Sequence, residues 1–187
     1  MSEVNHFFIG DYANEDDGKK HLVSILDKFQ DLFAVFPEVP GFCRQPRTGQ
    51  DRSPRIDFIL CPRQPLIDAG WSCGDIGIEC KAPGKKLGVA VAQVLDYSRC
   101  TFRLPSGRDS WLDQIFVWRI PKIAGCVESI MMQHRIGWIK SDNYCPLKFK
   151  MGVTNWIEAY EADHTTKDRV KVNSKLSNNT GRRFGSR

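Results

Sequence analysis

Three residues on two short apolar segments have the types and spacing needed for hydrolysis of a phosphate ester. Asp57 interrupts the run RIDFILC, where an unpaired charge is costly. Glu79 and Lys81 interrupt a second run, DIGIECKA, with one residue between them. Paired carboxylates are hard oxygen ligands for Mg²⁺ or Mn²⁺, and they leave positions for water and a phosphate oxygen. We therefore expect a metal-activated water, with Lys81 orienting the nucleophile or helping to deprotonate it.

Both segments have the pattern of β-strands. Residues 55–61 and 75–82 alternate between apolar and polar or small side chains, which predicts two strands with one polar face each. Asp57, Glu79 and Lys81 would then converge on one side of a sheet whose other side is apolar. The alternative interpretation is that these charges only line the solvated face of a strand, which a pattern this short does not exclude.

The segment after the second strand predicts a helix over residues 86–100. Its apolar residues recur at helical spacing, and Gln93 and Tyr97 are four residues apart and therefore share one face. A loop is expected at 101–110, a buried strand at 115–120, a helix at 122–134 and a short strand at 135–140.

Before the first strand, residues 18–36 predict an amphipathic helix that Asp16 or Asp17 caps and Pro37 ends. Residues 42–53 predict a short strand or an exposed basic loop. The resulting order predicts an α/β sandwich with a central mixed sheet and flanking helices. We expect a single domain over residues 1–162 and a flexible basic tail over 163–187, where apolar anchors are few.

Three motifs together resemble a known nuclease superfamily. Arg55-Ile56-Asp57, Glu79-Cys80-Lys81 and Gln93-Val94-Leu95-Asp96-Tyr97 are similar to the motifs of the PD-(D/E)XK nucleases, in the branch with a Q-x-x-x-Y motif. That branch includes RecB-type nuclease domains, lambda-type exonucleases and the nuclease domains of type I restriction enzymes. The resemblance implies a restriction-endonuclease-like sandwich with an αβββαβ core, followed here by a C-terminal helix and strand.

The resemblance also implies roles for individual residues. Asp57 and Glu79 would be metal ligands, Lys81 the catalytic lysine, and Gln93 and Tyr97 neighbours of the site that contact the nucleic-acid backbone or metal-bound water. Further ligands would be the backbone carbonyl of Cys80 and a helix histidine, for which His21 is the candidate. Glu15 or Asp17 is the alternative to His21, and a solvated helix histidine is its structural alternative.

The charge distribution fits an anionic partner. The net charge is +5 and combines −5 over residues 1–43, +5 over 44–162 and +5 over 163–187. Basic residues flank both motif strands, where they could hold DNA phosphates or serve only solubility. The candidate DNA-binding residues are Arg44, Arg47, Arg52, Arg55, Arg63, Lys85 and Lys86.

Composition excludes several other classes. No apolar run approaches the roughly 20 residues that span a bilayer, and the first residues lack a signal-peptide pattern, so a cytoplasmic protein is expected. Seven cysteines are an odd number without a C-x-x-C, so most should be buried reduced thiols. Of the five tryptophans, some could stack bases, whereas Trp118 and Trp138 fit the core.

These observations predict a Mg²⁺- or Mn²⁺-dependent deoxyribonuclease, typical of a phage, a mobile element or a repair and recombination pathway. Endonuclease and exonuclease action are both compatible with the sequence, and a homo-oligomer or a protein partner could direct cleavage. Two alternatives stay open: a non-catalytic nucleic-acid-binding module, and a nuclease-like protein that acts through protein contacts.

Overall fold

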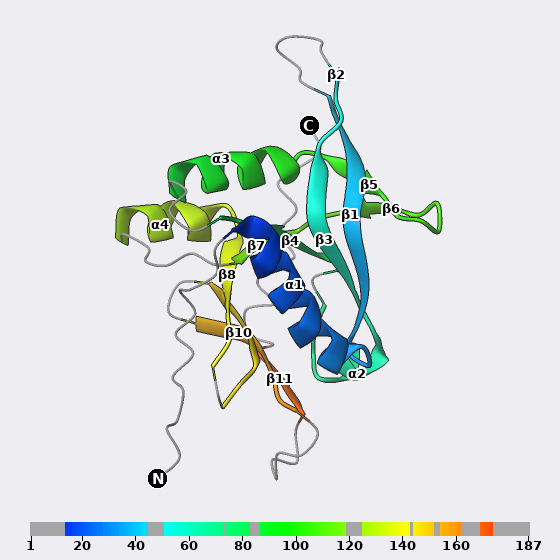
Figure 1. Cartoon of the computed structure of the whole chain (residues 1–187), viewed down its shortest axis with the longest axis vertical. Coiled ribbons are helices and arrows are strands. Elements are labelled where there is room, and N and C mark those ends of the chain that lie inside the picture. Colours follow the sequence, from blue (N-terminus) through cyan, green and yellow to red (C-terminus); the bar gives the residue numbers. More distant parts are fainter. Residues whose placement is uncertain are drawn as a thin grey trace.

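The computed structural model describes residues 14–44, 51–72, 74–82, 87–118, 125–142, 144–151, 154–161 and 169–173. It has an α/β architecture in which helices flank a mixed sheet (Figure 1). In chain order its elements are α1 (Glu15–Leu26), the 3-10 helix η1 (Asp27–Phe29), β1 (Phe33–Arg44), β2 (Asp51–Arg52), β3 (Arg55–Pro62), α2 (Gln64–Asp68), β4 (Ile76–Cys80), α3 (Leu87–Tyr97), β5 (Thr101–Arg103), β6 (Asp109–Trp111), β7 (Gln114–Trp118), α4 (Gly125–Gln133), β8 (Ile136–Lys140), β9 (Leu147–Met151), β10 (Thr154–Ala159) and β11 (Val170–Val172).

The sheet joins an antiparallel part to a parallel centre. Its strand order is β11-β10-β9-β8-β7-β4-β3-β1-β5-β6, and β2 pairs with β1 beside this path. Strands β1, β3 and β4 form an antiparallel meander. Strand β7 is parallel to both β4 and β8, and the chain reaches it through α3 and leaves it through α4. Crossover helices of this kind are what parallel neighbours require.

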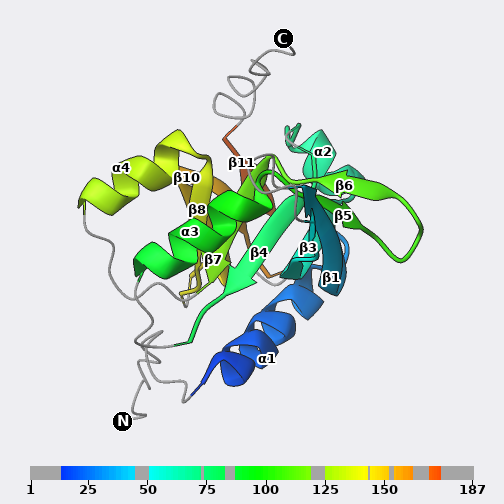
Figure 2. The same cartoon turned by 90° about the horizontal axis from the view of Figure 1, so that it is seen from above.

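Helices cover both faces of the sheet, which creates two apolar cores (Figures 1 and 2). The core on the side of α1 includes Leu22, Leu26, Phe29, Phe58, Ile78, Phe116, Trp118 and Phe149. The core on the side of α3 and α4 includes Ile59, Ala90, Val91, Val94, Tyr97, Val117, Met131 and Trp138. The alternative interpretation, in which Asp57 and Glu79 only line a solvated strand face, is therefore wrong, because both residues are buried and so is every other residue of β4.

The N-terminal helix is shorter than predicted. It ends at Leu26, and the apolar residues from Phe33 onward form β1 instead of further helical turns. The reason is tertiary: Phe33 to Pro40 pair with β3, and aromatic and β-branched side chains suit a strand with this neighbour. The cap also differs, since the Asn14 side chain accepts the backbone N–H of Asp17 at 2.9 Å.

The strand and helix predictions for residues 55–140 agree with the structure except in the segment 101–110 and at α2, which was not predicted. Strands β3, β4, β7 and β8 and helices α3 and α4 are confirmed, with shifts of a few residues at their ends. The expected loop at 101–110 is instead largely the antiparallel hairpin β5–β6. In the segment 42–53, the end of β1 pairs with β2, and residues 45–50 lie outside the described part.

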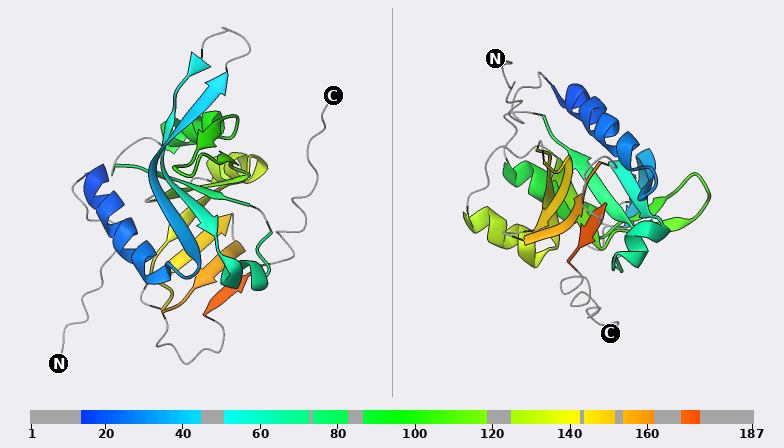
Figure 3. Two further views of the ribbon diagram at one scale, coloured as in Figure 1. Left: turned by 90° about the vertical axis from the view of Figure 1, so that its right-hand side faces the viewer. Right: turned by 90° about the horizontal axis from the view of Figure 1, so that it is seen from below.

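Three strands extend the sheet beyond the last predicted element. Strands β9, β10 and β11 form an antiparallel run at the sheet margin (Figure 3). Strand β11 lies within the segment 163–187 that we expected to be a flexible tail, so this part of the segment belongs to the sheet. Val170 and Val172 alternate with Lys171 and pack partly against the α1-side core, which explains the pairing. Residues 162–168 and 174–187 are outside the described residues.

The structure also bears on the burial of the tryptophans and on the presence of a membrane-spanning helix. Trp71, Trp118, Trp138 and Trp156 are buried, and Trp111 is exposed over 66% of its surface. In the described part of the chain, no helix combines the length and apolarity needed to cross a membrane.

Candidate nuclease site

Asp57 lies between α1 and β4, buried to all but 9% of its side chain. Its Oδ2 accepts the backbone N–H of Cys80 at 2.6 Å, and its Oδ1 is 2.5 Å from the Nζ of Lys19. The amide hydrogen bond joins β3 to the end of β4. Asp57 is therefore held in one orientation by a backbone amide and by a lysine from another element.

Lys19 is a site residue that the sequence analysis missed. Besides Asp57, its Nζ is 2.9 Å from Glu38 Oε1 and 3.9 Å from Glu15 Oε1. Burial lowers the pKa of Lys19, but hydrogen bonds and charge attraction from Asp57 and Glu38 outweigh it and raise the pKa above its usual range. The available signal was helical spacing, since Lys19 shares a face with the buried Leu22.

The backbone at Glu38 departs from regular strand geometry. Pro37 pairs with Phe58 and Val39 pairs with Ile56, which leaves Glu38 opposite Asp57. Glu38 has a φ of 49°, in the left-handed region that non-glycine residues rarely occupy. Such backbone conformations persist only where the surroundings impose them, and here the distortion lies next to the carboxylate of the candidate site.

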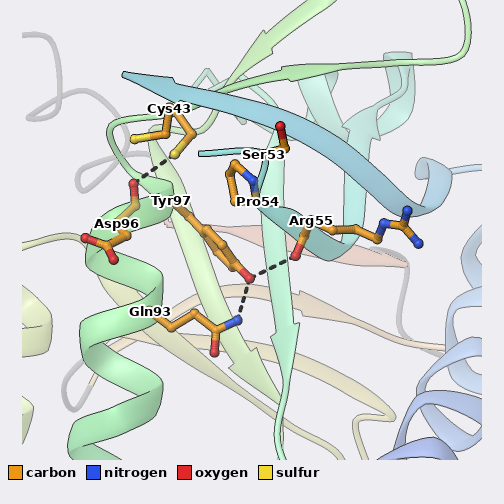
Figure 4. A pocket seen from close by; sticks show the side chains of 8 residues that line it. Cys43, Ser53, Pro54, Arg55, Gln93, Asp96 and Tyr97 are labelled. Atoms are coloured by element: carbon orange, nitrogen blue, oxygen red, sulfur yellow. Dashed lines mark hydrogen bonds between the residues drawn. The ribbon is translucent and has the colours of Figure 1, made fainter. Parts of the chain in front are cut away.

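A chain of polar side chains runs from β4 to β3 through α3. The Nζ of Lys81 contacts Glu79 Oε1 and donates to Gln93 Oε1 at 2.8 Å. Gln93 Nε2 then donates to the Tyr97 hydroxyl at 2.5 Å, and this hydroxyl donates to the backbone carbonyl of Arg55 at 2.8 Å (Figure 4). The structure therefore brings the E-x-K and Q-x-x-x-Y residues into one network, as helical spacing of Gln93 and Tyr97 requires.

The surroundings of Glu79 disfavour the charged form of its side chain. Burial first, and the nearby charge of Asp57 second, raise the pKa of Glu79 to about 7, although the adjacent Lys81 opposes the shift. Its Oε2 is buried and has no hydrogen-bond partner among the described residues. A buried carboxylate oxygen without a donor, close to a second carboxylate, is the environment that a divalent cation would stabilise. Asp57 and Glu79 are therefore the two described side chains that could hold a metal.

A third side-chain ligand does not join Asp57 and Glu79 among the described residues. The described residues contain no group of three or more His, Cys, Asp and Glu side chains arranged to hold a metal ion. The His21 ring lies 5.9 Å from the ring of Trp118, centre to centre, so this histidine packs toward the α1-side core. Among the described residues, His21 does not form a three-side-chain group with Asp57 and Glu79, and its role as a ligand stays a prediction.

Five cysteines are free thiols, which agrees for these residues with the expectation of reduced cysteines: Cys43, Cys61, Cys80, Cys100 and Cys145. Burial raises the pKa of the Cys80 thiol above its usual range, as it does for Cys61 and Cys145, to about 12 and about 11. Raised pKa values disfavour the thiolate, so these side chains are poor nucleophiles.

Two of the candidate DNA-binding residues have described side chains. Arg55 and Arg63 are both exposed, but they lie at opposite ends of β3, and only Arg55 is close to Asp57 in the strand. Arg44 belongs to β1 and Arg52 to β2, and for these two residues only the backbone is described. Residues Arg47, Lys85 and Lys86 lie outside the described ranges.

No family model matches this chain, and neither a curated protein nor a solved structure is significantly similar to it.

Proposed function

We propose that the protein is a divalent-metal-dependent nuclease that hydrolyses DNA phosphodiester bonds. The observation that carries this proposal is the meeting of two buried carboxylates, Asp57 and Glu79, with Lys81 and its hydrogen-bonded partner Gln93. A buried like-charge pair is costly unless a cation or a proton compensates it. Two buried carboxylates with a lysine linked to one of them fit a catalytic role better than a purely structural one.

The roles follow from the contacts of each side chain. Asp57 and Glu79 would hold Mg²⁺ or Mn²⁺, which when bound supplies Lewis-acid polarisation of the phosphate and lowers the pKa of water. Lys81 is held by Glu79 and Gln93, so its ammonium is fixed beside the carboxylates, where it can orient the nucleophile. The Gln93–Tyr97 hydrogen bond limits rotation of Gln93 and so keeps its oxygen directed at Lys81.

The element order supports the same proposal. The succession α1, β1, β3, β4, α3 and β7 agrees with the helix, three strands, helix and strand of the restriction-endonuclease-like core that the motifs imply. The antiparallel β1–β3–β4 meander followed by a parallel β7 places the Asp57 and Glu79 strands side by side. We propose this core, extended by the α4–β8 unit and the β9–β11 strands, as the scaffold of the nuclease.

The test compares the parent protein with Lys81→Ala and with Lys20→Ala as the matched control. Lys20 is adjacent to Lys19 on α1 but its side chain is 80% exposed. Each protein is incubated with linear, circular, single-stranded and branched DNA in the presence of Mg²⁺, Mn²⁺ or EDTA. Metal-dependent cutting by the parent and Lys20→Ala, lost in Lys81→Ala, is the expected result. Equal cutting by Lys81→Ala, or no cutting of any substrate by the parent, would refute the proposal.

One observation favours the second candidate, a non-catalytic nucleic-acid-binding module. Lys19 already balances the charge of Asp57 at 2.5 Å, as a purely structural ion pair would. Metal-independent DNA binding without cutting, unaffected by Asp57→Asn, is the outcome that identifies this alternative.

A further inference from the structure

A pocket of about 510 Å³ adjoins the candidate site (Figure 4). One wall is the last turns of α3, with Gln93, Asp96 and Tyr97, and the opposite wall is the start of β3 with Ser53 and Pro54 before it. Because the pocket lies between two elements that the Tyr97–Arg55 hydrogen bond joins, its walls are held at a fixed separation.

The pocket shares two side chains with the polar network of the site. Gln93 and Tyr97 both line it, and Gln93 accepts a hydrogen bond from Lys81. A molecule bound in the pocket would therefore lie one side chain away from the lysine that we place beside the reacting phosphate. The pocket is thus positioned for a part of the substrate that adjoins this phosphate.

The chemistry of the lining disfavours a second phosphate. Arg55 lines the pocket with its backbone carbonyl while its guanidinium extends away, and the backbone carbonyl of Asp96 accepts from the Cys100 thiol (Figure 4). The remaining surface is the tyrosine side chain, Pro54, and the thiols of Cys43 and Cys100. Hydrogen-bond acceptors together with flat apolar surface suit an uncharged planar group that carries N–H donors.

We propose that this pocket binds the base of the nucleotide next to the cleaved phosphodiester bond. The inference rests on the proposed nuclease function and adds a substrate subsite to it. A base enters such a pocket only after leaving its stack, which costs least in single-stranded DNA or at a frayed end.

The first experiment measures cutting of labelled single-stranded oligonucleotides in which one nucleotide at a time is abasic. The parent should cut about tenfold more slowly when the abasic residue lies at one position next to the cut, since the stacking of a bound base on an aromatic ring is then lost. Ser53→Phe, which narrows the pocket, should cut the normal substrate about as slowly as the abasic one. Ser106→Phe, in the exposed β5–β6 turn, is the control and should retain the parental preference.

If the parent cuts DNA but is indifferent to abasic residues at every position, the pocket proposal is wrong and the nuclease proposal stands.

Binding provides a readout that does not need cutting. In EDTA, an oligonucleotide with 2-aminopurine at successive positions should show a fluorescence change at one position when the parent binds, and Ser53→Phe should abolish that change. If the parent cuts nothing, the nuclease proposal fails, and this measurement alone decides on the pocket. An identical fluorescence response of the parent and Ser53→Phe would overturn the inference.

Discussion

At the scale of residues, the candidate site is a balance between buried carboxylates and two lysines. Asp57 and Glu79 are 7% and 3% exposed, and each contacts a different lysine, Lys19 and Lys81. Because charges attract strongly where water is displaced, the lysines and a divalent cation would compete for the same negative potential. Lys19, which reaches the carboxylates from another element, is the side chain that a metal would displace most directly from Asp57.

We therefore predict that Lys19→Met binds divalent metal more tightly than the parent. Removing an ammonium 2.5 Å from Asp57 Oδ1 leaves the carboxylates without this counter-ion, and we expect affinity to rise about tenfold, or ~1.4 kcal/mol. Titration calorimetry with Mn²⁺ measures the change, with Lys20→Met as control. Unchanged or weaker binding by Lys19→Met would show that Lys19 does not compete with the metal.

The raised pKa of Glu79 predicts a pH dependence of folding in metal-free protein. Its ordinary pKa is 4.5 and its folded pKa is about 7, so between these values the folded state binds more protons than the unfolded state. The contribution of Glu79 to stability is therefore present below pH 4.5 and is lost as the pH rises toward 7. Denaturant unfolding in EDTA should show this loss, and Glu79→Gln should reduce it. Parallel pH profiles of the parent and the variant would contradict the assignment.

At the scale of elements, α1 is positioned by its cap and by one buried contact. Asn14 accepts the backbone N–H of Asp17, and the Trp118 indole donates to the backbone carbonyl of Gly18 at 3.0 Å. Gly18 directly precedes Lys19, so these contacts fix the helix turn from which Lys19 reaches Asp57. The stability of this turn and the geometry of the site are thus coupled.

Loss of the cap should weaken this end of the helix. Asn14→Ala removes a side-chain acceptor for a helix N–H, and we predict a decrease of about 1 kcal/mol in the free energy of unfolding. Urea denaturation measures the effect, and Ser106→Ala in the exposed β5–β6 turn is the control. A decrease no larger than that of the control would mean that the Asn14 hydrogen bond does not stabilise α1.

How much of the fold could be read from the sequence depends on whether local pattern or distant pairing decides each element. Alternation in β3 and β4 and helical spacing in α3 reflect local burial, and these elements were predicted. The segment from Phe33 has helical spacing as well, but pairing with β3 makes it a strand, and a single sequence does not display that partner. The β5–β6 hairpin and β11 were missed because short strands carry few alternating residues.

The same distinction applies to the site. Glu79, Lys81, Gln93 and Tyr97 lie close in sequence, and strand and helix periodicity suffices to place them together. Lys19 was not predicted, because its contact with Asp57 depends on how α1 docks against the sheet. The His21 assignment came from the family resemblance, and the structure adds that its ring lies near that of Trp118.

At the scale of the whole molecule, β11 and the residue before it connect the C-terminal segment to the sheet and to residues that follow α1. It pairs with β10, and Arg169 before it is 2.5 Å from Asp31 and lies over the Phe29 ring. A chain that ends after residue 173 retains these contacts, whereas one that ends after residue 168 loses all of them. This pair of truncations separates the strand from the basic residues that follow it.

We predict that the truncation after residue 168 lowers the melting temperature, while the truncation after residue 173 leaves it near that of the full chain. If the basic residues beyond 173 contact DNA, the longer truncation product should still bind DNA more weakly and with a flatter salt dependence than the full chain. Thermal melting and binding at two salt concentrations check both statements. Equal melting temperatures of the two truncated proteins would contradict a stabilising role of β11.

The two cores on opposite faces of the sheet have a consequence for cooperativity. Lys19 comes from the helix on one face and Gln93 from a helix on the other, and both contact residues at the ends of neighbouring central strands. Detachment of either helix would remove one of these contacts, whichever core stayed intact. The contacts at Asp57 and Lys81 therefore link the two layers, so that replacing both residues should speed hydrogen exchange in α1 and α3 together.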